Sequence, residues 1–283
     1  MNKKNRSLLE IHLAVLLFGL SGLFGKLVDL PAMVIVFGRV LFSSIFLYSV
    51  LFYLKKSIKL DHCKDYISML LMGILLTIHW TTFFLSIQLS TVAIGLLTFS
   101  TFPVFVTFLE PYFFKEKIKI SDIAVAIITF FSIILLLPQF ELKNHVIQGA
   151  LWGIVSGFTY ALLSIFHRKY VESYSGIVVA FYEQLSSTVI LLPFFFFYRT
   201  AFQINDIVLL LILGVLFTGI AHSLFINGLQ NIKIQTAGII SCLEPVYGII
   251  FAAFLLHELP TSREIIGGGI ILSTVLYSTI KSK

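Results

Sequence analysis

A carboxylate and a proline stand side by side within a strongly apolar stretch of the chain. Glu244-Pro245 lies near the middle of 234–256, IQTAGIISCLEPVYGIIFAAFLL, a run long enough to cross a bilayer as one helix. A charge at the bilayer midplane costs at least about 2.5–3.5 kcal/mol on insertion scales, so an acid there is a candidate for function. Proline cannot donate a backbone hydrogen bond, which predicts a helix break at this point. We expect Glu244 to handle substrate or protons; the alternative is a hydrogen bond to a neighbouring helix.

Other charged or titratable residues also lie inside apolar runs. The fork of Arg39 suits a carboxylate, so Arg39 either binds or gates a solute or anchors its helix by snorkelling. Its counterpart in the second half of the chain is Glu183, and we expect both in the outer part of the membrane, where a buried Arg–Glu pair can act as a gate. His79 and His222 can relay protons near neutral pH or simply pack between helices.

Aromatic residues follow the same segments and suggest a wall for an amphipathic or cationic ligand. Lipid-facing packing explains aromatic residues equally well. Trp80, Tyr160, Phe181, Tyr182 and Tyr247 form this set. The candidate substrate-binding or gating residues are therefore Arg39, His79, Trp80, Tyr160, Glu183, His222, Glu244 and Tyr247, with helix breaks at Pro103 and Pro245. We assign no catalytic residue, metal ligand or cofactor.

The composition requires a membrane to position these residues. The chain has 283 residues, of which 58% are hydrophobic and 12% charged, whereas soluble proteins average about 25% charged. This balance predicts an all-α polytopic membrane protein. The net charge of +6 does not indicate a nucleic-acid partner, because the basic residues sit in short loops. The chain holds no GxxxxGK[ST] sequence, so we expect no ATP-driven step on it.

Ten apolar segments of about 20 residues are long enough to span the bilayer. The first is longer than the core of a secretory signal and nine others follow it, so we interpret it as a span. The two cysteines do not suggest a disulfide framework. The predicted spans are 8–27, 32–54, 66–87, 91–113, 119–138, 147–168, 175–198, 206–228, 234–256 and 263–280.

The distribution of lysine and arginine predicts the orientation. Fifteen basic residues fall on the segments that face the cytoplasm if the N-terminus does, and four fall on the opposite loops. Positively charged loops stay in the cytoplasm, so we expect an integral protein of the cytoplasmic membrane with both termini inside.

The two halves of the chain resemble each other. A shift of 142 residues places Phe83 on Phe225, Pro103 on Pro245 and Val104 on Val246. Each half has five spans, and because five is odd the second copy enters the membrane upside down. Inverted repeats are a common plan of secondary transporters, with the site between them near the midplane. We expect the repeats at 8–138 and 147–280.

The duplicated motifs resemble the drug/metabolite transporter superfamily, EamA type. They are the Ser-Gly pairs at 21–22 and 156–157, Arg39 in FGRVLFSS, the run from His79-Trp80 through Pro103 to Glu116, and its second copy from His222 through Glu244-Pro245 to Glu258. The resemblance implies a carrier that exports or imports small metabolites, with a central cavity lined by both halves. We expect a secondary active or facilitative exporter of compounds such as amino acids or drug-like molecules, working by alternating access as a monomer or homodimer. The first half has Phe102-Pro103 where the second has Glu244-Pro245, so we expect an asymmetric site with any proton coupling at Glu244.

Three other classes of protein remain as alternatives. A flippase for a lipid or lipid-linked substrate would share this fold. A channel would show rings of like charge, and the sequence suggests none. An intramembrane enzyme would need a base beside Ser21, and the Ser-Gly pair recurs in the second half, so it is better explained by helix packing. We therefore expect a protein that is not an enzyme.

Overall fold

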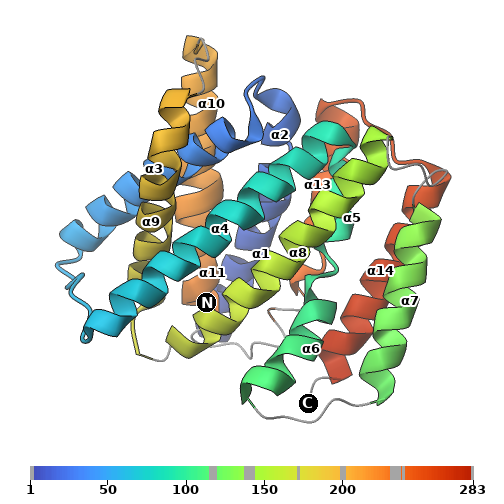
Figure 1. The fold of residues 1–283 in the computed structure, drawn as a ribbon, viewed down its shortest axis with the longest axis horizontal. Helices are drawn as coiled ribbons and strands as arrows, with labels where there is room; N and C mark the ends of the chain where they lie inside the picture. Colours follow the sequence, from blue (N-terminus) through green and yellow to red (C-terminus); the bar gives the residue numbers. More distant parts are fainter. Residues whose placement is uncertain are drawn as a thin grey trace.

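The computed structural model describes residues 3–114, 120–136, 144–170, 173–197, 202–229, 237 and 240–281. Within these ranges the ordered elements are helices and no strand occurs, so the prediction of an all-α protein is confirmed (Figure 1). The helices are α1 (Lys3–Ser21), α2 (Phe24–Leu27), α3 (Ala32–Tyr53), α4 (Cys63–Leu89), α5 (Val92–Phe99), α6 (Phe102–Phe114), α7 (Ile120–Leu136), α8 (His145–Tyr170), α9 (Gly176–Phe197), α10 (Ile204–Gly214), the π-helix η1 (Val215–Ile220), α11 (Ala221–Leu229), α13 (Glu244–Leu255) and α14 (Ser262–Lys281).

The helices follow the predicted spans closely. Seven continuous helical stretches of the described chain are long and apolar enough to cross a membrane, and two shorter apolar helices cover Ile123–Leu136 and Glu244–Leu255. The predicted span 32–54 corresponds to α3, and 147–168 lies within α8. The protein is therefore a polytopic membrane protein, as its hydropathy predicts.

The fourth and ninth predicted spans are interrupted rather than continuous. Helix α5 ends at Phe99 and α6 begins at Phe102, directly before Pro103. Helix α13 begins at Glu244, after a turn at residues 242–243, with Pro245 in its first turn. The expectation that 234–256 crosses as one helix is thus wrong. Proline lacks the amide hydrogen that a continuous helix needs, but it fits the first turn of a new helix.

The packing of the helices repeats between the two halves. Helices α3 and α9 pack together, as do α5 and α13, and α7 and α14; each pair joins equivalent spans of the two halves. The pair α4 and α8, side by side across the front of Figure 1, has its counterpart in α11 and α1. Exchanging the halves therefore maps one set of contacts onto the other, as expected for two related five-helix units.

Close approach of the helices depends on glycine at particular positions. A Cβ added at Gly19 of α1 would lie 2.5 Å from the carbonyl oxygen of Glu244, so α1 and the start of α13 touch through their backbones. Gly153 of α8 lies against Thr98 of α5 with similar closeness. Small residues allow such close approach between membrane helices.

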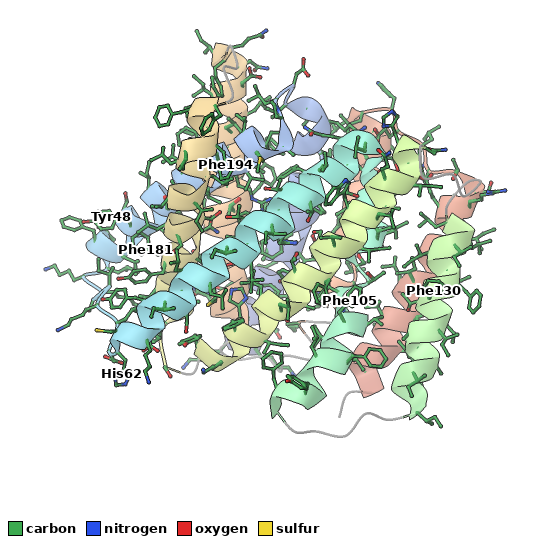
Figure 2. All side chains as sticks on the ribbon, viewed as in Figure 1. Tyr48, His62, Phe105, Phe130, Phe181 and Phe194 are labelled. Atoms are coloured by element: carbon green, nitrogen blue, oxygen red, sulfur yellow. The ribbon has the colours of Figure 1, made fainter. Side chains whose placement is uncertain are left out.

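The outer surface of the bundle is apolar. Tyr48 and Phe130 project away from the bundle in Figure 2, with exposed fractions of 50% and 61%, and Phe194 is 45% exposed. Large apolar side chains exposed around the whole bundle suit contact with lipid.

Candidate functional site

A cavity of about 60 Å³ lies at the centre of the bundle, between helices of both halves. One water molecule needs about 10–15 Å³ by the same measure, so the cavity has room for several. Seven of the eight candidate binding or gating residues line it: Arg39, His79, Trp80, Tyr160, Glu183, His222 and Glu244. They come from α3, α4, α8, α9, α11 and α13, and the fold therefore gathers polar residues that are far apart in sequence.

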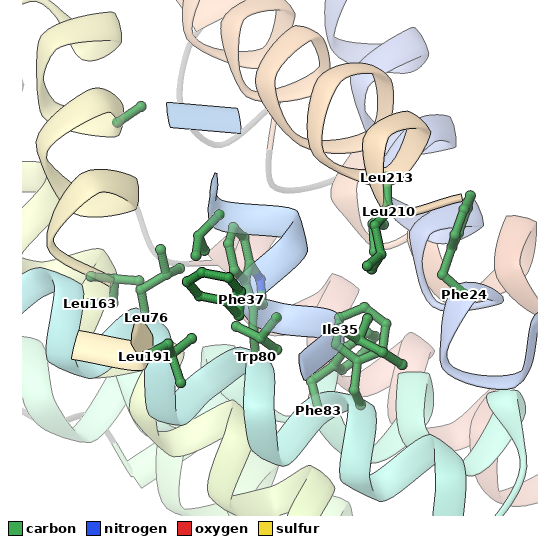
Figure 3. Close-up of a cluster of buried hydrophobic side chains, with 14 of the residues drawn as sticks. Phe24, Ile35, Phe37, Leu76, Trp80, Phe83, Leu163, Leu191, Leu210 and Leu213 are labelled. Carbon is green, nitrogen blue, oxygen red and sulfur yellow. The ribbon is translucent and has the colours of Figure 1, made fainter. Parts of the chain in front are cut away.

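Arg39 is buried and held by two neighbours. Its Nε donates to Thr218 Oγ1 at 2.8 Å, and its guanidinium carbon lies 3.8 Å from the centre of the Trp80 ring. Such a cation–π contact is favourable, and more so away from water. Trp80 itself lies in the buried apolar cluster with Leu76, Phe37 and Phe83 (Figure 3). Arg39 thus faces the cavity instead of reaching the membrane surface.

The π-helix η1 provides the partner of Arg39. Thr218 Oγ1 donates to the carbonyl oxygen of Leu213 at 2.8 Å, five residues earlier, and accepts from Arg39. Single π-turns inside α-helices occur frequently at functional sites. The wider turn therefore places one buried hydroxyl where it fixes the orientation of the guanidinium.

Glu183 pairs with a residue that the sequence did not single out. Its Oε2 lies 2.7 Å from His167 Nε2 of α8, whereas Arg39 bonds Thr218. Glu183 Oε1 is buried and has no hydrogen-bond partner among the described residues. The ion-pair gate between Arg39 and Glu183 that the sequence suggested is therefore absent from this structure.

The expected depth of Glu183 is also wrong. Arg39 comes seven residues after the start of α3, at the upper end of Figure 1, and Glu183 comes seven residues after the start of α9, at the opposite end. Inverted copies exchange the two sides of the membrane, so equivalent residues lie at opposite depths. The cavity consequently has a basic residue toward one side and an acidic residue toward the other.

His79 contacts both the backbone and the side chain of Ser156. Its Nδ1 lies 3.1 Å from the carbonyl oxygen of Ser156 and 2.9 Å from the Ser156 hydroxyl oxygen. A carbonyl oxygen only accepts, so a hydrogen on Nδ1 would satisfy that contact, whereas a bare Nδ1 would accept from the hydroxyl. Either way the contact ties α4 to α8 beside the cavity.

Aromatic rings complete the wall of the cavity, although not all of the predicted ones. His79 lies 4.9 Å from the Tyr160 ring and 5.2 Å from Phe99, and His222 lies 6.0 Å from Trp80. The equivalent residues Trp80 and His222 therefore meet across the centre. Phe181, Tyr182 and Tyr247 are not among the lining residues. Tyr182 Oη instead donates to the Ile58 carbonyl, and Tyr247 packs against a separate cluster that includes Ile11.

Glu244 lies where α13 begins, and it lines the cavity without a hydrogen bond to the residues that the structure describes. The amides of a helix N-terminus carry partial positive charge, which favours a carboxylate there. The backbone of Glu244 contacts Gly19. The interruption before Pro245 thus places the acid at a helix end inside the bundle, and not along a continuous helix face.

Polar contacts between the halves lie at both ends of the bundle. At the upper end Lys26 Nζ lies 3.8 Å from Glu258, and Thr91 donates to Glu264 at 2.9 Å. Within the first half, Lys26 Nζ also donates to the Ser90 carbonyl at 2.7 Å.

At the lower end two tyrosines of the second half bond to α4. Tyr170 donates to Ser68 at 2.6 Å and Tyr174 to Asp65 at 2.5 Å, and the bond to Asp65 raises the pKa of the Tyr174 phenol. The central cavity therefore lies between two sets of polar contacts, one at each end of the bundle. Opening the cavity toward one end would break the contacts at that end.

Sequence reasoning missed three polar residues of the site: Ser156, His167 and Thr218. His167 precedes the basic pair 168–169, so it reads as part of a cytoplasmic loop boundary. Thr218 carries no charge, and no sequence signal marked the π-turn that aims it. Ser156 was noted only as part of a Ser-Gly packing pair. Each of the three stands out only through its hydrogen bond to a residue on another helix.

Comparison with known proteins gives a family and a fold. The sequence pattern of the EamA-like transporter family matches residues 6–137 and 147–280. The chain is 24% identical over 254 residues to a Bacillus subtilis (strain 168) protein named uncharacterized transporter YxxF, covering 88% of this chain and 81% of that one. It is 26% identical over 251 residues to a protein named S-adenosylmethionine uptake transporter from Rickettsia conorii, covering 88% and 83%. One solved crystal structure shares the fold with a TM-score of 0.68 at 13% identity, over 97% of this chain and 96% of that chain.

Proposed function

The chain belongs to the EamA-like transporter family, of the drug/metabolite transporter type, and we propose that it moves a small polar metabolite through its central cavity by alternating access. The observation that supports this most is the gathering of seven polar or aromatic candidate residues from six helices around one cavity. Buried charges inside a membrane bundle are costly, and they mark substrate and ion pathways.

The cavity suits a solute that carries both charges. Arg39 presents a guanidinium, which pairs well with a carboxylate, while Glu183 and Glu244 present acids. Trp80 and Tyr160 add aromatic faces for a cation or an apolar side chain. We propose amino acids and similar zwitterionic metabolites as the substrate class. S-adenosylmethionine, named for the Rickettsia relatives, carries a carboxylate and two cationic groups and belongs in the same test.

We propose that Glu244 carries the coupling proton. Glu244 has no hydrogen bond among the residues that the structure describes, and a carboxylate in a bundle centre can exchange a proton for a solute when the cavity opens to either side. Glu244→Gln in proteoliposomes should then abolish pH-dependent uptake and preserve solute exchange, because the amide keeps the shape but cannot titrate. Pro103→Ala, in the first half, serves as a control that leaves all acids in place. Unchanged pH dependence in the Glu244→Gln protein would remove this role.

Direction and topology are proposed from the same premises. We propose export from the cytoplasm, both termini inside, and repeat boundaries at 8–138 and 147–280. Because the Rickettsia relatives are named for uptake, direction needs its own measurement: counterflow in vesicles of known orientation. Faster loading from the cytoplasmic face supports export, and the reverse asymmetry contradicts it.

A lipid substrate is the second candidate, and one observation favours it. An apolar crevice of about 270 Å³ lies between α3, α9 and α10, lined by residues such as Phe37, Phe42, Phe195 and Leu210. It is separate from the polar cavity and opens among membrane-spanning helices. Transfer of a fluorescent lipid between leaflets, faster with protein than in empty vesicles, would support a flippase over a metabolite carrier.

A further inference from the structure

One carboxylate oxygen of the buried residue Glu183 lacks a hydrogen bond among the described residues. The residue is 3% exposed, so its carboxylate is removed from bulk solvent. Oε2 is bonded to His167 Nε2 at 2.7 Å, and Oε1 has no partner among the residues that the structure describes. Buried polar atoms are normally hydrogen-bonded, and an unpaired buried carboxylate oxygen is among the most costly to leave so. The residue lines the central cavity but Oε1 itself has almost no exposed surface, so a donor in the cavity reaches this oxygen only when the wall around it opens.

The cations of the cavity wall do not supply that donor. Arg39 is the one lysine or arginine among the described lining residues, and its Nε is committed to Thr218 while its guanidinium lies over the Trp80 ring. His79 directs Nδ1 at Ser156, and His167 Nε2 is bonded to Oε2. The lining also includes the hydroxyl groups of Ser21 and Tyr160, but no described residue donates to Oε1.

We propose that Glu183 is the ammonium-binding residue of the cavity, with Oε1 accepting an N–H bond from a protonated primary amine of the solute. His167 is a positioning residue: its bond holds Oε2 and leaves Oε1 without a donor from the described protein. This inference rests on the proposed function and adds a chemical requirement to it, namely a cationic amine that can donate hydrogen bonds. Arg39 then takes the opposite, anionic end of the solute.

The most direct test is ligand-induced stabilisation of the purified protein. Ethylammonium chloride is the cationic probe, sodium propionate the anionic probe, and sodium chloride the control at equal ionic strength. A ligand that binds only the folded state raises the unfolding temperature. We expect a saturable rise with ethylammonium beyond that with sodium chloride. In Glu183→Gln the apparent affinity for ethylammonium should fall about tenfold or more, because the amide oxygen can still accept an N–H bond but no longer carries the negative charge that strengthens it. The response to propionate should be kept.

A matched pair at His167 separates positioning from binding. His167→Gln keeps an N–H that can reach Oε2, so ethylammonium binding should stay within a few-fold of wild type. His167→Leu removes the bond and should weaken ethylammonium selectively, without changing the response to propionate. Equal loss of both responses in His167→Leu would instead indicate a general structural defect and overturn the positioning role.

A measurement on the unmodified protein covers the case in which Glu183→Gln does not fold. Tetramethylammonium has the same charge as ethylammonium but no N–H group, so it should stabilise the wild-type protein less. Equal stabilisation by the two cations, or no response to ethylammonium beyond that to sodium chloride, overturns the assignment. Solute flux in proteoliposomes is measured separately. Flux without ethylammonium binding would contradict only the role of Glu183. Ethylammonium binding without any solute flux would contradict the proposed transport function.

Discussion

The two halves of the bundle share a packing plan and differ in chemistry. Equivalent helices pair with each other, α3 with α9, α5 with α13 and α7 with α14. Yet the equivalent positions hold Arg39 and Glu183, Trp80 and His222, and Phe102 and Glu244. The helical scaffold is duplicated, whereas the polar lining of the cavity is not. The first half therefore contributes a basic side chain to the cavity, and the second half contributes acidic ones.

The difference is clearest at the two interrupted helices. In the first half Phe102 stacks on Phe99 at 5.4 Å and meets Tyr160 edge-on at 4.9 Å. In the second half the equivalent Glu244 stands at the start of α13 and lines the cavity. One interruption therefore fills space with aromatic packing, and the other presents an acid. The following predictions run from the largest expected effect to the smallest.

Making the first half resemble the second should have the largest effect. Phe102→Glu removes two ring contacts and inserts an acid with no partner, which costs several kcal/mol. We expect little folded protein by size-exclusion chromatography in detergent and a strongly lowered unfolding temperature. Phe102→Leu keeps an apolar side chain and should fold. Wild-type stability of Phe102→Glu would mean that the two interruptions are chemically equivalent after all.

Removing the positive charge of Arg39 should stop transport without unfolding the protein. Arg39→Gln keeps a donor for Thr218 but loses the charge, so solute uptake in proteoliposomes should fall about a hundredfold, as for a buried charge pair that loses one member. Thr218→Val leaves the charge and removes only its orientation, and it should cost less. Uptake at the wild-type rate by folded Arg39→Gln would rule out a substrate contact.

The contact between the equivalent residues Trp80 and His222 allows a comparison with a smaller expected effect. Trp80→Leu removes the ring under Arg39, a contact of about 0.5–2 kcal/mol, whereas His222→Leu removes only ring contacts with Trp80 and Phe18. We expect the unfolding temperature and solute affinity to fall more in Trp80→Leu. The opposite ranking would show that His222 contributes more than packing.

Substituting the glycine of each Ser-Gly pair by alanine should have the smallest effect on stability, and the effect should differ between the two halves. A Cβ at Gly157 would lie 3.1 Å from the Phe99 carbonyl oxygen, while one at Gly22 would lie 3.4 Å from the flexible end of Ile87. Gly157→Ala should therefore destabilise by about 1–3 kcal/mol and Gly22→Ala by less. Thermal unfolding of the two variants side by side gives the ranking; equal losses would make the packing of the halves more symmetric than these distances indicate.

Much of the fold followed from the sequence because hydropathy alone sets span length in a membrane. The bounds of α3 and α9 were predicted within a residue or two, and intramembrane charge pointed to Arg39, Glu183 and Glu244. Which side chains bond to each other did not follow from the sequence. The bond from His167 to Glu183 and the π-turn that aims Thr218 depend on distances between helices, which periodicity does not contain.

The depth of Glu183 shows a different kind of error. An inverted repeat places equivalent residues at opposite depths, so the repeat itself contradicts the expectation of Arg39 and Glu183 on the same side. The interruption of the ninth span likewise follows from Pro245, because proline cannot continue the helix that precedes it. Repeat symmetry and helix geometry together predict a cavity with Arg39 toward one side and Glu183 toward the other.

Water accessibility of the cavity tests its central role most directly. In a protein whose Cys63 and Cys242 are replaced by alanine, a cysteine is placed at Ser21, which lines the cavity, or at Ser273, which is exposed on α14. A membrane-impermeant thiol reagent should modify Ser21→Cys in proteoliposomes, more slowly when transported solute is present, and should leave Ser273→Cys unmodified in the lipid. Modification of Ser273→Cys but not of Ser21→Cys, or no protection by solute, would contradict a solute pathway between the two halves.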